Sequence, residues 1–95
     1  MITQHIYISR PGDNEVVHNE KMRLEKFSKE ELVEYYNRVA AKGFFGSHMQ
    51  CLHIAALHFT MERFFGVSPI QILGQGRLLK LGEQVTLNSE GELEI

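Results

Sequence analysis

The sequence has a single cysteine, and this scarcity limits the chemistry open to it. Cys51 stands alone among 95 residues, so no disulfide can form within the chain. Chains without disulfides are typical of reducing compartments. The first residues show neither the basic segment nor the long apolar run of a secretion signal. We therefore expect a cytoplasmic protein.

The sequence also lacks an excess of either charge. Ten Lys and Arg residues against 12 Asp and Glu residues give a formal net charge of -2. So small a charge creates no general attraction to nucleic acid or to an anionic membrane, and DNA binding would need a local basic patch. The hydrophobic fraction of 43% is ordinary for a globular protein. A chain of this length suits one domain, which we expect to span residues 1–95.

The longest helical pattern runs over residues 47–65 and ends at Gly66. Its apolar side chains do not form one stripe: Leu52 and Leu57 fall on roughly opposite sides. A helix that is apolar on most sides is normally buried on most sides. Histidine and charged side chains along it exclude a membrane span, because ionisable groups are costly in hydrocarbon. We predict a long buried central helix, covered by its own chain and in part by a partner.

A second helix is predicted from its two ends. Ser28 and Glu31 have the spacing of a capping box, in which each side chain bonds the other residue's backbone amide. Apolar residues then recur at helical spacing over residues 29–42. Gly43 is suited to the left-handed position after the last turn. Because only residues 43–46 separate the two helices, we expect an antiparallel helix pair.

The regions on either side favour strands. Alternation over residues 3–10, a Pro-Gly turn and a second apolar alternation over residues 15–26 predict an N-terminal β-hairpin. A C-terminal hairpin is expected around the turn at residues 88–91. For residues 70–80 two interpretations stay open: a short third helix capped by Ser68, or a strand with a Gly-rich turn. The predicted class is α+β, with the strands in one antiparallel sheet.

Residues that could carry chemistry are few. His48 and Cys51 lie three apart in a helical pattern and could approach one metal ion, but no third ligand is fixed by the spacing. Cys51 near a helix start could also be an activated thiol, yet no orienting acid or oxyanion loop is identifiable. Both are more simply structural residues. We expect no metal, no cofactor and no catalytic activity.

One segment has a recognisable form. Residues 63–72, Arg-Phe-Phe-Gly-Val-Ser-Pro-Ile-Gln-Ile, resemble the turn of helix-turn-helix DNA-binding domains. The resemblance implies a winged-helix-like DNA-binding regulator, with a recognition helix between Ser68 and Lys80 and the terminal hairpin as a wing. The residues available for base and phosphate contacts would be Gln71, Gln75, Arg77 and Lys80. Since basic residues are few there, DNA binding is the alternative hypothesis.

Aromatic residues supply the leading hypothesis. More aromatic side chains flank the two helices than one helix pair can hide on a single face. We expect part of them to bury against a partner. The residues expected at this interaction surface are Phe44, Phe45, Phe64 and Phe65. The predicted function is a small non-enzymatic protein-interaction or regulatory domain that self-associates through an apolar helical face or binds another protein.

Overall fold

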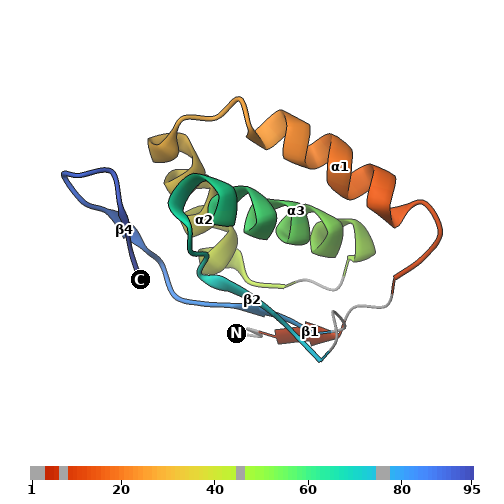
Figure 1. Cartoon of the computed structure of the whole chain (residues 1–95). Coiled ribbons are helices and arrows are strands. Elements are labelled where there is room, and N and C mark those ends of the chain that lie inside the picture. The colour runs from red at the N-terminus through yellow and green to blue at the C-terminus, as the bar shows by residue number, and fades with distance from the viewer. Residues whose placement is uncertain (1–3, 7–8, 45–46, 75–77) are drawn as a thin grey trace.

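The computed structural model describes the backbone of residues 4–6 and the full structure of residues 9–44, 47–74 and 78–95. Helices and small antiparallel sheets coexist within these ranges, which confirms the predicted α+β class (Figure 1). The helices are α1 (Asp13–Leu24), α2 (Lys29–Lys42) and α3 (His48–Phe65). The strands are β1 (Gln4–Ile6), β2 (Ile70–Leu73), β3 (Leu78–Leu81), β4 (Thr86–Leu87) and β5 (Leu93–Glu94).

The predicted N-terminal β-hairpin is wrong, because helix α1 stands where its second strand was expected. Residues 15–26, expected as its second strand, mostly belong to α1. The buried side chains of α1 are Asp13, Glu20 and Leu24, which recur at helical spacing. Two of these three are acidic, so the inward face did not stand out as apolar in the sequence. Acidic residues in the first turn and basic residues in the last also suit the helix dipole.

The second helix matches its prediction at both ends. The Ser28 hydroxyl accepts a hydrogen bond from the Glu31 amide at 3.1 Å, and the Ser28 amide donates to Glu31 Oε1 at 2.9 Å. This reciprocal pair is the capping box. Gly43 follows the last turn with a φ of 70°, in the region that favours glycine. The sequence alone therefore located α2 correctly.

Helix α3 begins after Ser47, whose hydroxyl accepts from the Gln50 amide at 3.3 Å, and ends at Gly66 in the left-handed conformation. The helix alongside α3 is α1, and the two run in the same direction, because His48 meets Asp13 near the start of both helices. Figure 1 shows α2 lying across α3 instead, so the expected antiparallel pair is not formed. Helix α1, and not α2, is therefore the helix that packs along α3.

The strands form two sheets and not the single predicted one. In the first, β3 lies between β1 and β2 and is antiparallel to both. Residues 70–73 are therefore a strand. Of the two interpretations left open for this segment, the strand is confirmed and the short third helix is wrong. In the second, β4 pairs with β5, which confirms the C-terminal hairpin. Between the two sheets, Asn37 of α2 accepts a hydrogen bond from the Val85 amide at 2.8 Å and donates one to the Val85 carbonyl at 2.9 Å.

The core lies between the three helices and the inner face of β2 and β3. Tyr36, Leu57 and Met61 are almost completely buried there. They pack with Ile70 of β2 and Leu79 of β3 in one continuous cluster. Within the ranges described, no helix combines the length and apolarity that crossing a membrane requires.

Candidate functional site

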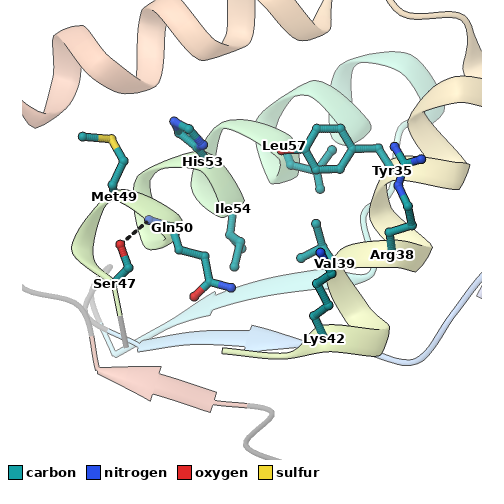
Figure 2. A pocket seen from close by; sticks show the side chains of 10 residues that line it. All are labelled: Tyr35, Arg38, Val39, Lys42, Ser47, Met49, Gln50, His53, Ile54 and Leu57. Carbon is teal, nitrogen blue, oxygen red and sulfur yellow. Dashed lines mark hydrogen bonds between the residues drawn. The ribbon is translucent and has the colours of Figure 1, made fainter. Parts of the chain in front are cut away.

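A groove of about 470 Å³ lies between α2 and α3 (Figure 2). Its floor is apolar: Val39 of α2 faces Ile54 of α3. Leu57 extends this floor one turn further along α3. The groove exists because α2 crosses α3 at an angle and does not pack along it, so the two helices diverge beyond their contact.

The rim of the groove is positively charged on the α2 side. Arg38 and Lys42 line it and are exposed. Among the ion pairs of the described residues, none involves either side chain. On the α3 side the rim carries Met49, which is 50% exposed, and Gln50. The Gln50 side-chain amide donates to the Gly43 carbonyl at 2.9 Å and so joins the end of α2 to the start of α3.

Helix α1 places an ion pair behind one end of the groove, between the buried Glu20 and the half-exposed Arg23. Glu20 is 7% exposed and accepts two hydrogen bonds from Arg23, from Nε at 2.8 Å and from Nη2 at 2.7 Å. The Arg23 guanidinium lowers the pKa of Glu20 below its usual value, against the opposing effect of burial. His53, which lines the groove, has Nδ1 3.8 Å from Glu20 Oε2.

The Arg23 guanidinium also packs against two aromatic rings, those of Tyr35 and Phe27. The carbon of the Arg23 guanidinium lies 5.7 Å from the centre of the Tyr35 ring and 5.3 Å from that of Phe27. Burial raises the pKa of Tyr35, so its hydroxyl is neutral at physiological pH. Tyr35 therefore contributes an apolar ring and a neutral polar group to the groove.

The two weak metal candidates have structural surroundings. Cys51 is 1% exposed, and burial raises the pKa of its thiol, which disfavours the reactive thiolate. His48 Nε2 lies 3.1 Å from both carboxylate oxygens of Asp13, which links α3 to α1. In the part of the chain that the structure describes, no three His, Cys, Asp or Glu side chains are grouped to hold a metal ion.

The predicted phenylalanine surface is only partly exposed. Phe44 is buried, and Phe64 and Phe65 are half-buried against the core. The Lys29 ammonium lies 5.5 Å from the centre of the Phe65 ring, where it partly covers the ring. Phe45 lies outside the described residues. The three described residues, Phe44, Phe64 and Phe65, therefore offer less apolar surface to a partner than the sequence suggested.

The described residues between Ser68 and Lys80 do not form the recognition helix that the DNA-binding alternative requires. Gln71 lies on β2 and Lys80 on β3, directly opposite each other in the antiparallel register. Gln75 and Arg77 lie outside the described residues. A strand pair in place of a helix after Ser68 removes the structural feature on which the helix-turn-helix resemblance depended. DNA binding stays a prediction that no described contact supports.

Comparisons with protein-family models, with curated proteins and with solved structures found no match. The site is therefore interpreted from its own geometry. The sequence did not reveal the groove, because its two walls come from different helices. In the sequence alone, Arg38 and Lys42 suit the helix dipole at the end of a helix, and Val39 belongs to an ordinary apolar stripe. Only the angle between α2 and α3 turns these residues into one surface.

Proposed function

We propose that this protein is a small non-enzymatic protein-interaction domain that self-associates through the groove between α2 and α3. One observation carries the proposal: in the groove between α2 and α3, an apolar floor stands next to a cationic rim that takes part in no ion pair of the described residues. Ligand sites are typically concave and apolar, with a few polar groups that fix orientation. The groove has this composition.

A protein segment suits the groove better than an enclosed small molecule. Met49, Arg38 and Lys42 stand exposed along the rim, so a ligand in the groove would keep one side in solvent. Interface cores favour methionine and aromatic residues, and their rims are polar. Met49 and Tyr35 next to the charged rim follow that pattern.

A binding role is also supported by how the reactive side chains are engaged. Cys51 is buried, His48 is held by Asp13, and Glu20 is held by Arg23. The His48–Asp13 contact joins α3 to α1, whereas the Glu20–Arg23 pair lies within α1. The proposal therefore assigns them structural roles, and it places the domain in the cytoplasm, where a lone thiol is kept reduced.

Replacing Met49 with glutamate tests the groove directly. Self-association through the groove makes thermal stability depend on protein concentration, because the unfolding equilibrium includes dissociation. In the M49E variant a carboxylate stands at the rim, and we expect the midpoint temperature to become independent of concentration.

Val67→Glu is the matched control, because Val67 is 47% exposed and lies outside the groove. V67E should keep the concentration dependence of the wild-type protein. An equal loss in both variants, or no dependence in the wild type, would contradict the proposed surface. Calorimetry over a hundredfold range of protein concentration gives the readout.

A further inference from the structure

We infer that the groove of one copy binds the acidic C-terminal hairpin, β4 and β5, of a second copy. The inference rests on the proposed function and adds to it the segment that enters the groove. The hairpin and the groove are complementary in charge, and each carries exposed apolar side chains.

The groove presents positive charge without an internal counterion. Arg38 and Lys42 lie four residues apart on α2, so they stand one turn from each other on the same face. No ion pair among the described residues neutralises either of them. The imidazole ring of His53 lines the wall of the groove that α3 forms, opposite Arg38 and Lys42. A complementary segment should therefore present at least two carboxylates close together.

The C-terminal hairpin presents such carboxylates. Glu92 and Glu94 are exposed, and their spacing of two residues puts them on the same face of the extended chain. Neither takes part in an ion pair of the described residues. Ile95, next to Glu94, is 76% exposed and adds an exposed apolar side chain to the end of the hairpin. Glu90, in the turn, adds a third exposed carboxylate.

The hairpin of the same chain does not fill its own groove. Figure 1 shows the hairpin on the far side of α2 from α3, whereas the groove lies between these helices. The Lys29 ammonium donates to the Gly91 carbonyl at 3.2 Å and holds the hairpin at the start of α2. The groove is lined by the later turns of α2. The contact is therefore between copies, and a reciprocal exchange about a two-fold axis closes a dimer with two identical contacts.

A charge exchange between two variants tests the pairing. The first variant, R38E/K42E, has an acidic groove and an acidic hairpin. The second, E92K/E94K, has a basic groove and a basic hairpin. Each variant alone brings like charges together, so we expect self-association at least roughly tenfold weaker than in the wild type. An equimolar mixture restores opposite charges at both contacts, and we expect a heterodimer of nearly wild-type affinity.

Two control variants carry the same charge changes elsewhere. R10E/K26E matches the first variant in net charge, and E15K/E83K matches the second. All four control residues are exposed and lie outside both the groove and the hairpin. Each control alone should associate far more strongly than the variant it matches. Circular dichroism checks that every variant keeps its helices.

Sedimentation velocity on the variants alone and mixed gives three distinguishable results. Weak association of each variant alone, with recovery on mixing, supports the pairing of groove and hairpin. Wild-type association that neither variant weakens, or that mixing does not restore, overturns this pairing and leaves self-association through another surface. A wild-type protein that is monomeric at every concentration overturns both the pairing and the proposed function.

Discussion

Replacing Arg23, which is 51% exposed, with methionine is expected to lower the free energy of unfolding by roughly 1–2 kcal/mol once solvent screening is allowed for. The reason is the position of Glu20, which is 7% exposed and accepts both guanidinium hydrogen bonds. Without Arg23 this carboxylate stays buried and loses its main charged partner. A buried charge left without its partner costs more than the pair itself contributes.

A double-mutant cycle separates these two quantities. Glu20→Met combined with Arg23→Met replaces the pair by apolar side chains of similar length. We expect the double variant to lose less stability than R23M alone, because no buried charge remains. Urea denaturation at one fixed protein concentration measures all four proteins. A double variant that loses the sum of both single losses would show that Glu20 and Arg23 are not coupled and would contradict this explanation.

The same pair predicts a dependence on pH. The pKa of Glu20 is lowered in the folded protein, so its ion pair stabilises the fold fully above the carboxyl's ordinary value. This contribution is lost as the pH falls through the lowered pKa of the folded state. The difference in stability between the wild type and R23M should therefore shrink on acidification. A difference that is constant from neutral to acidic pH would contradict this interpretation of Glu20.

Replacing Gly82 with alanine is expected to cost about 1–3 kcal/mol, the range for forcing a methyl group into a filled space. A Cβ atom at this position would lie 2.7 Å from the Pro69 carbonyl oxygen, which belongs to the backbone and cannot rotate away. The Gly82 amide donates to that same oxygen at 3.1 Å.

The Gly82 carbonyl is engaged as well. It accepts from the Tyr36 hydroxyl at 2.8 Å, and burial raises the pKa of Tyr36 to about 12. A shift of the backbone at Gly82 would therefore disturb a buried hydrogen bond in addition to the strand pairing. Gln84→Ala, two residues on at an exposed position, is the control and should leave the midpoint unchanged. Equal stability of G82A and the wild type would show that the backbone there relaxes freely.

The parts of the fold that were predictable from sequence are those set by local chemistry. Ser28 and Glu31 specify the start of α2 because both partners of the capping box lie within one turn. Gly66 specifies the end of α3 through its own left-handed conformation. Such signals need no knowledge of the rest of the chain.

The parts that were not predictable depend on contacts between distant segments. Helix α1 was mistaken for a strand because its inward face is built on Asp13 and Glu20, whose partners His48 and Arg23 make their burial possible. The role of Gly82 is its close approach to the Pro69 backbone, which the residues next to it in the sequence do not indicate. The groove likewise depends on the angle at which α2 crosses α3.

The measurement that tests the account most directly is the mass of the wild-type protein by sedimentation equilibrium over a wide range of concentrations. The chain mass is 11.0 kDa. Self-association through reciprocal groove contacts predicts a mass that rises with concentration and levels off at twice this value. A mass that stays at 11.0 kDa at all concentrations, at low and at physiological salt, would contradict the proposed function.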